Sequence, residues 1–127
     1  MSDSIFTKII KGEIPCHKIY EDELSLSFLT IRPVQPGHTL VVAKKQIDHI
    51  WDLSDEDYQA VMAASKKVAR RMKDVLGVKR IGVKIIGEEV PHAHVHLVPF
   101  NTLEEFDQIP RTVPDEELAE MAKKLAF

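Results

Sequence analysis

The sequence has a single cysteine, no long apolar run and no excess of basic residues. Cys16 has no second cysteine to pair with, so an intrachain disulfide is excluded and a reducing compartment is expected. No segment approaches the ~20 consecutive apolar residues that a membrane span needs. Residues 1–15 also lack the apolar core and small-residue cleavage site of a secretory signal. We therefore expect a cytoplasmic protein without a membrane partner.

The charge of the chain is nearly balanced. There are 17 basic and 20 acidic residues, for a net charge of -3, and the basic ones are spread along the sequence. Nucleic-acid binding relies on a concentrated positive surface. The balance argues against a nucleic-acid partner and predicts that an anionic ligand would be bound by a local site.

The length of 127 residues suits one domain, since domains typically run to ~100–150 residues. No internal repeat or low-complexity linker divides the chain. We predict a single domain over residues 1–127 that ends in a short helical tail.

The predicted secondary structure is a group of strands around one long helix. Ser54, as an N-cap, and Gly77, as a stop, delimit the long helix, and shorter helices are expected at residues 4–12 and 115–125. Strands are predicted at residues 17–20, 24–29, 39–44, 80–86 and 92–100, the last two forming a hairpin through residues 87–91. This order predicts an α+β fold with an antiparallel sheet of about five strands.

Three of the six histidines of the chain alternate in one predicted strand, in the order Pro-His-Ala-His-Val-His. Side chains alternate across a strand, so His92, His94 and His96 are expected on one face. A solvated outer face could explain them. They could also ligate a catalytic metal, or serve phosphoryl or nucleotidyl transfer with one imidazole as nucleophile. The spacing alone leaves these alternatives open.

Other segments of the chain resemble the histidine triad family. The resemblance rests on the alternating histidines, on the upstream segment Ile-Arg-Pro-Val-Gln-Pro-Gly-His-Thr-Leu-Val-Val at residues 31–42, and on residues 5–15. It extends over residues 5–100. It implies a homodimer that acts on the α-phosphate of a small-molecule nucleotide, as a nucleoside phosphoramidase or a dinucleoside polyphosphate hydrolase does, without a cofactor.

The resemblance also implies roles for individual residues. His94 would be the nucleophile and form a nucleotidyl-histidine intermediate, His92 and His96 would position the phosphate, and His38 would complete the catalytic group. The substrate-binding positions that it implies are Phe6, Thr30, Ile31 and Glu89. Two alternatives are a nucleotide-binding or interaction module with vestigial catalysis, and a metalloenzyme that uses the histidines as ligands.

The sequence departs from the family at two sites. Many bacterial relatives hold a structural zinc with two N-terminal cysteines and a histidine after the central strand, where this chain has Ser4, Thr7 and Gln46. We therefore expect no zinc. Thr30 replaces the acidic residue or asparagine that binds the ribose in relatives, and Glu89 lies in a shortened loop, where a carboxylate would repel a phosphate.

Overall fold

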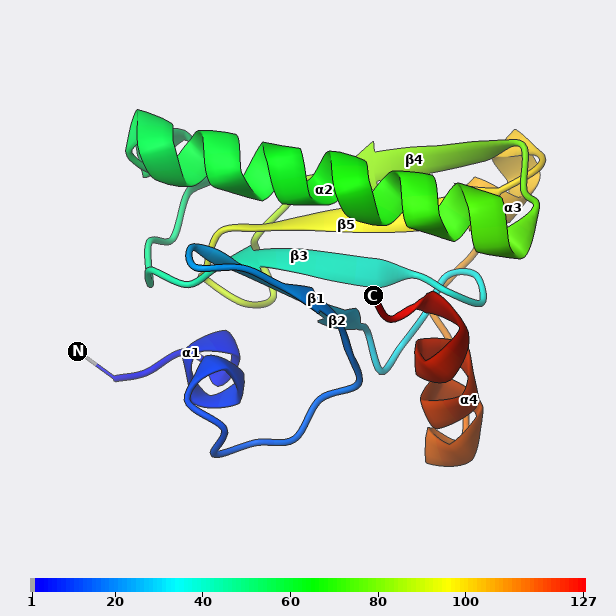
Figure 1. Cartoon of the computed structure of the whole chain (residues 1–127), viewed down its shortest axis with the longest axis horizontal. Helices are drawn as coiled ribbons and strands as arrows, with labels where there is room; N and C mark the ends of the chain where they lie inside the picture. The colour runs from blue at the N-terminus through cyan, green and yellow to red at the C-terminus, as the bar shows by residue number, and fades with distance from the viewer. Residues whose placement is uncertain (1) are drawn as a thin grey trace.

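The structure, a computed structural model, describes residues 2–127 and contains one five-stranded antiparallel sheet. The strands follow the spatial order β1-β2-β3-β5-β4, with β3 in the centre (Figure 1). Their bounds are β1 Lys18–Glu21, β2 Ser25–Leu29, β3 Thr39–Ala43, β4 Arg80–Lys84 and β5 His94–Phe100. The predicted α+β class with five antiparallel strands is confirmed.

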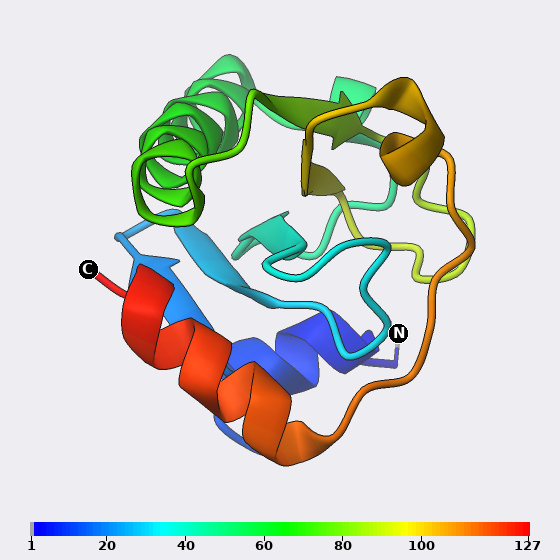
Figure 2. The same cartoon turned by 90° about the vertical axis from the view of Figure 1, so that its right-hand side faces the viewer.

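Helices cover both faces of the sheet. The long helix α2 (Asp55–Leu76) runs along one face and is joined there by α4 (Asp115–Leu125), while α1 (Ile5–Ile10) lies on the opposite face (Figures 1 and 2). Ser54 caps α2 by accepting a hydrogen bond from the Asp57 N–H, and Gly77 ends it in a left-handed conformation, as predicted. Within residues 2–127, none of the helices has the length and apolarity that crossing a bilayer requires.

The central strand β3 separates two apolar cores. Val41 and Ala43 pack toward α2, whereas Leu40 and Val42 pack with Phe6 of α1 on the other side. All of β3 is buried, because it lies in the centre of the sheet and is covered on both faces. The smaller core beneath α1 forms the floor on which the histidines lie.

The connection before the histidines differs from the prediction. Strand β4 ends at Lys84 and β5 begins at His94, so the link spans residues 85–93 and His92 lies outside the strand. Two hydrogen bonds keep His92 out of the strand. The His92 N–H donates to Val90 O at 2.8 Å across a turn at Pro91, and the Ala93 N–H donates to Ile47 O at 2.7 Å. The backbone there pairs with the loop after β3 instead of with β4. Two short elements, Ile50–Asp52 and α3 (Leu103–Phe106), were also not predicted.

Gly37 shapes the loop that leads into β3. Its φ of 94° is readily adopted only by glycine, and a Cβ there would lie 2.8 Å from Cδ1 of Leu76 at the end of α2. The same Cβ would also approach Leu125 of α4 at 3.8 Å. The loop that leads to His38 therefore packs directly against helices α2 and α4.

Candidate active site

Four histidines gather on the face of the sheet that α1 covers. The register places His94 opposite Val42 and His96 opposite Leu40, so both imidazoles share the side of those two apolar residues. His38 immediately precedes β3, and its ring centroid lies 5.2 Å from that of His96. The structure thus brings together the four histidines that the sequence singled out.

His92 is fully buried and held at both ring nitrogens. Its Nε2 lies 2.6 Å from the carbonyl oxygen of Ala43, which can only accept, so Nε2 carries the proton and donates. Its Nδ1 is then an acceptor and lies 2.6 Å from the hydroxyl of Ser4. These two contacts select one tautomer of His92.

His94 is oriented by the backbone of His92. Its Nδ1 lies 2.6 Å from the carbonyl oxygen of His92, which makes Nδ1 the donor and leaves the lone pair on Nε2. Phe6 packs edge-on against the ring at a centroid distance of 4.9 Å. Phe6 is itself buried, so it lies beneath His94 as a support for the imidazole.

His38 and His96 form a directed pair. The backbone N–H of Val34 donates to Nδ1 of His38 at 3.0 Å, which places the His38 proton on Nε2. That nitrogen lies 3.0 Å from Nδ1 of His96 and donates to it. In neutral His96 the remaining proton is on Nε2, where it can be donated to a ligand.

The four histidines are held neutral by burial. Loss of solvation lowers the pKa of every one of them, because the charged form is disfavoured away from water. The pKa of His38 falls to about 3 and that of His96 to about 4, and in each case the charge of a neighbouring imidazole adds to the effect of burial. The tautomers deduced above are therefore those present at neutral pH.

Lys84 belongs to the site but was missed in the sequence analysis. It lies opposite His96 in the register, and its positive charge contributes, after burial and a neighbouring histidine, to the low pKa of both His38 and His96. Its Nζ lies 4.5 Å from the centroid of the Phe106 ring. Only the strand register identifies this lysine as a neighbour of the histidines, and the sequence does not give that register.

The remaining expected substrate-binding residues lie near two of the histidines. The Thr30 N–H donates to the carbonyl oxygen of His38 at 3.2 Å, and the next residue, Ile31, is 70% exposed. Glu89 is exposed in the loop before His92, and its charge slightly raises the pKa of His94 against the larger lowering by burial. Residues 30–31 thus lie next to His38, and the loop that carries Glu89 lies next to His92.

The three residues at the positions where the resemblance implies a structural zinc, Ser4, Thr7 and Gln46, also come together. Ser4 and Thr7 of the α1 N-terminus are linked by hydrogen bonds to Gln46 after β3, and the two hydroxyl groups contact Nδ1 of His92. Zinc in proteins is bound by thiolates, imidazoles and carboxylates. Two hydroxyls, an amide and one imidazole do not make such a set. Over residues 2–127, no group of at least three His, Cys, Asp or Glu side chains has a metal-binding arrangement.

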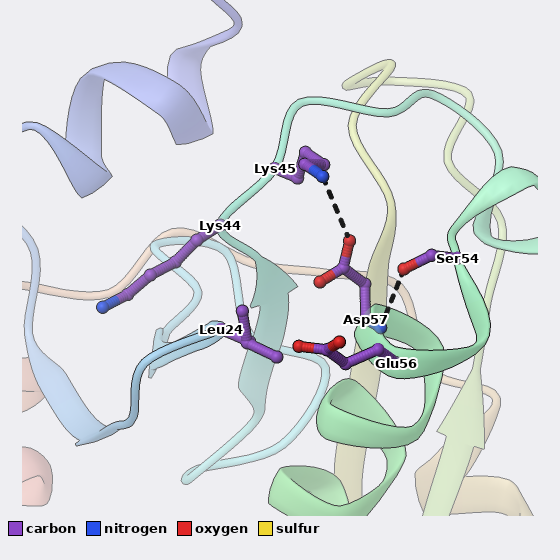
Figure 3. Close-up of a pocket in the computed structure, with 6 residues that line it drawn as sticks. All are labelled: Leu24, Lys44, Lys45, Ser54, Glu56 and Asp57. Atoms are coloured by element: carbon purple, nitrogen blue, oxygen red, sulfur yellow. Dashed lines mark hydrogen bonds and ion pairs between the residues drawn. The ribbon is translucent and has the colours of Figure 1, made fainter.

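A surface pocket of about 360 Å³ has no histidine in its lining (Figure 3). It lies between the end of β3 and the start of α2, and Lys45 Nζ is 3.8 Å from the Asp57 carboxylate across it. Its lining residues are Leu24, Lys44, Lys45, Ser54, Glu56 and Asp57. Its two carboxylates balance its two lysines, so the pocket offers a phosphate no net positive charge.

Comparison with known proteins agrees with the geometry. The model of the HIT domain family matches residues 11–103. The chain belongs to the histidine triad family. It is 41% identical over 96 residues to the adenosine 5'-monophosphoramidase of Saccharomyces cerevisiae, a match that covers 75% of this chain and 61% of the yeast protein.

Solved structures of histidine triad proteins share the fold. A HIT-like protein from Bartonella henselae, described as involved in cell-cycle regulation, superposes with a TM-score of 0.85 at 34% identity and covers 97% of this chain and 94% of its own. A zinc-bound histidine triad family protein from Mycobacterium smegmatis superposes with a TM-score of 0.82 at 30% identity, covering 95% and 88%.

Proposed function

We propose that this protein is a hydrolase or transferase that acts on the α-phosphate of a nucleotide through a nucleotidyl intermediate on His94. The observation that carries the proposal is the contact between His94 Nδ1 and the His92 carbonyl oxygen at 2.6 Å. A nucleophilic imidazole needs one nitrogen free and the other held as a donor. His94 meets that condition with its Nε2.

The neighbouring groups are suited to bind the phosphate. His96 presents Nε2–H as a donor because its Nδ1 accepts from His38. The histidines are neutral, so a positive charge at the site has to come from another residue. In the strand register the nearest such residue is Lys84, which lies opposite His96. A donor and a cation beside the nucleophile would stabilise negative charge that builds up on the phosphate oxygens in the transition state.

The reaction divides into two displacements. The Nε2 lone pair of His94 forms a bond to the α-phosphorus while the leaving group departs with the electron pair of its own bond and takes a proton from water. Water then attacks the phosphorus, releases a proton to solvent, and the electron pair of the phosphorus–nitrogen bond returns to Nε2. Each displacement is easier than direct attack by water.

A nucleoside phosphoramidate is the substrate class we favour. Two yeast relatives bear the name adenosine 5'-monophosphoramidase and share 41% and 38% identity with the matched segments of this chain. An amine is also a small leaving group, which suits a site whose flanking loop carries Glu89. Dinucleoside polyphosphates, which would bring additional negative charge next to that carboxylate, are less favoured.

Rapid-quench kinetics with adenosine 5'-phosphoramidate tests this function. We expect a burst of released ammonia equal to the enzyme concentration, and a nucleotidyl adduct on the peptide that contains His94, detected by mass spectrometry. Binding of adenosine monophosphate without turnover would instead support a nucleotide-binding module. Turnover that is abolished by a chelator would support the metalloenzyme.

The metalloenzyme is the weaker alternative because few ring nitrogens are free. Within residues 2–127, only His94 Nε2 and His96 Nε2 of the four histidines have no hydrogen-bond partner. A catalytic zinc takes three protein ligands. The histidines would have to break existing hydrogen bonds to supply them.

We also propose that the chain forms one domain and associates as a homodimer. The sheet has two edge strands, β1 and β4, and Val83 of β4 is 51% exposed. An exposed edge strand is a template for pairing with another strand. Sedimentation equilibrium at micromolar concentration should give twice the chain mass, and a monomer would contradict the dimer.

A further inference from the structure

We propose that Ser4, Thr7 and Gln46 form a metal-free hydrogen-bonded clamp that fixes the tautomer of His92 and, through the His92 carbonyl group, aligns His94. The three are positioning residues, because none touches the proposed reaction centre. The catalytic consequence rests on the proposed function. The tautomer of His92 does not depend on that function, so the clamp and the proposed function can be disproved separately.

Gln46 organises the clamp from the loop after β3. Its Oε1 accepts two hydrogen bonds, from Ser4 N–H at 2.8 Å and from the Thr7 hydroxyl at 2.6 Å. Its Nε2 donates to the carbonyl oxygen of Ser2 at 3.0 Å, which fixes the orientation of the amide. The N-terminal turn of α1 is thereby tied to the loop after the central strand.

The direction of the remaining bonds follows from these. The Thr7 hydroxyl donates its proton to Gln46, and Ser4 Oγ accepts from the Thr7 N–H at 3.0 Å as the N-cap of α1. Ser4 retains its own hydroxyl proton, for which His92 Nδ1 at 2.6 Å is the nearer acceptor and Thr7 Oγ1 at 3.2 Å the more distant. The proton of Ser4 therefore goes to His92 Nδ1.

The clamp holds His92 from two sides. Ser4 binds one ring nitrogen from α1, and the Ala43 carbonyl oxygen binds the other from the end of β3. The next peptide is fixed as well, because Ala93 N–H donates to Ile47 O at 2.7 Å and Ala93 O accepts from Ala43 N–H at 3.3 Å. The His92 carbonyl group lies between these fixed points and receives the Nδ1–H of His94.

The donor set explains why the clamp functions without a metal. In relatives, thiolates would need a cation to bridge them to an imidazole, whereas hydroxyl groups bond to the imidazole directly. The Ser4 hydroxyl bonds to the His92 ring directly, with no bridging ion between them. The clamp therefore positions His92 by hydrogen bonds between protein groups alone.

The first test is the protonation pattern of His92, measured by long-range ¹H–¹⁵N NMR on the intact protein. We expect a protonated Nε2 and an unprotonated Nδ1. A protonated Nδ1, or exchange between the two tautomers, would overturn the proposal whether or not the protein has catalytic activity.

Ser4→Asp sharpens this test while retaining a helix N-cap. A carboxylate can only accept, so His92 would need a proton on Nδ1 as well and become an imidazolium. We expect both ring nitrogens to be protonated at pH 7 in this variant. An unprotonated Nδ1 beside a carboxylate at residue 4 that carbon-13 NMR shows to be ionised would mean that residue 4 does not face the ring, and would overturn the clamp.

The kinetic test separates positioning from stability. Ser4→Ala should lower kcat roughly ten- to hundredfold with little change in KM, because an unpaired ring nitrogen lets His92 and then His94 reorient. Ser4→Thr should restore most of kcat by returning the hydroxyl, and Lys8→Ala on the exposed side of the same helix is the control. Wild-type kcat in Ser4→Ala would contradict the positioning role.

A variant designed to bind zinc tests whether the side chains of residues 4, 7 and 46 all point toward Nδ1 of His92. Ser4→Cys, Thr7→Cys and Gln46→His, combined, would offer two thiolates and an imidazole around Nδ1 of His92, a set that suits tetrahedral zinc. We expect one zinc per chain in the triple variant and none in the wild type. Lack of zinc in the triple variant, or stoichiometric zinc in the wild type, would each overturn the proposal.

Discussion

The Nδ1 atom of His94 lies 2.6 Å from the carbonyl oxygen of His92, so the first histidine of the triad orients the second through its backbone. The contact assigns the proton of His94 without reference to any ligand. The imidazole side chain of His92 and its carbonyl group thus have separate tasks. The ring is held by Ser4 at the start of α1 and by Ala43 of β3, and the carbonyl group holds His94.

Replacing His94, the proposed nucleophile, should abolish turnover. We expect His94→Ala to reduce kcat to the background rate, because none of the other three clustered histidines has a ring nitrogen whose lone pair is free and whose partner nitrogen is held as a donor. His92→Ala and His96→Ala should lower kcat less, since each removes support or a donor and leaves Nε2 of His94 in place. Near wild-type turnover of His94→Ala at saturating substrate would exclude the covalent mechanism on this residue.

The acid limb of the pH profile should lie below the ordinary titration range of histidine. Burial lowers the pKa of His94, and the nucleophile must be neutral, so kcat/KM should fall only as the pH drops through that lowered pKa. Glu89 raises this pKa slightly, so Glu89→Gln should move the acid limb to lower pH. Glu88→Gln, the matched control, should leave it in place. An acid limb above pH ~6.5 in the wild type would contradict the neutral site.

Lys84 should contribute to phosphate recognition. Lys84→Met removes a positive charge from beside His96, and we expect kcat/KM to fall roughly tenfold or more. The same change should raise the pKa of His96, because Lys84 lowers it in addition to the larger effect of burial. Histidine NMR titration measures that shift. Lys79→Met, at an exposed position before β4, is the control, and equal effects of the two variants would remove Lys84 from the site.

Thr30 should make ribose recognition weak. A carboxylate can accept from both ribose hydroxyls, and such charge-assisted bonds are stronger than the bond that a threonine hydroxyl offers. Thr30→Asp should therefore tighten binding of adenosine monophosphate roughly tenfold. The gain should vanish with the 2',3'-dideoxy analogue. Calorimetry with both ligands measures it, and equal gains would show that residue 30 does not face the sugar.

Much of the fold could be predicted because its signals are local. The caps Ser54 and Gly77 mark the ends of α2, and the apolar run at residues 39–43 marks a strand buried on both faces. The boundary at His92 could not be predicted this way. A sequence that alternates like a strand is diverted there because Ala93 bonds to Ile47, a partner distant in the chain.

The site was predictable to the extent that it depends on the histidine spacing. Lys84 was missed because its proximity to His96 depends on the register of β4 against β5. The clamp is an intermediate case. Ser4, Thr7 and Gln46 were noted as departures from the family, but the bonds that join them to His92 exist only once α1 is folded against the sheet.

Gly37 links the reactive face of the sheet to the helices behind it. Its missing Cβ leaves room for Leu76 and Leu125, and the residue that follows is His38. A substitution that enlarges either leucine would displace this turn and, with it, the His38–His96 pair before it affected His94. Attempts to stabilise the protein by repacking the helical face should therefore spare these two leucines, because a gain in melting temperature there would come at the expense of the proton arrangement in the active site.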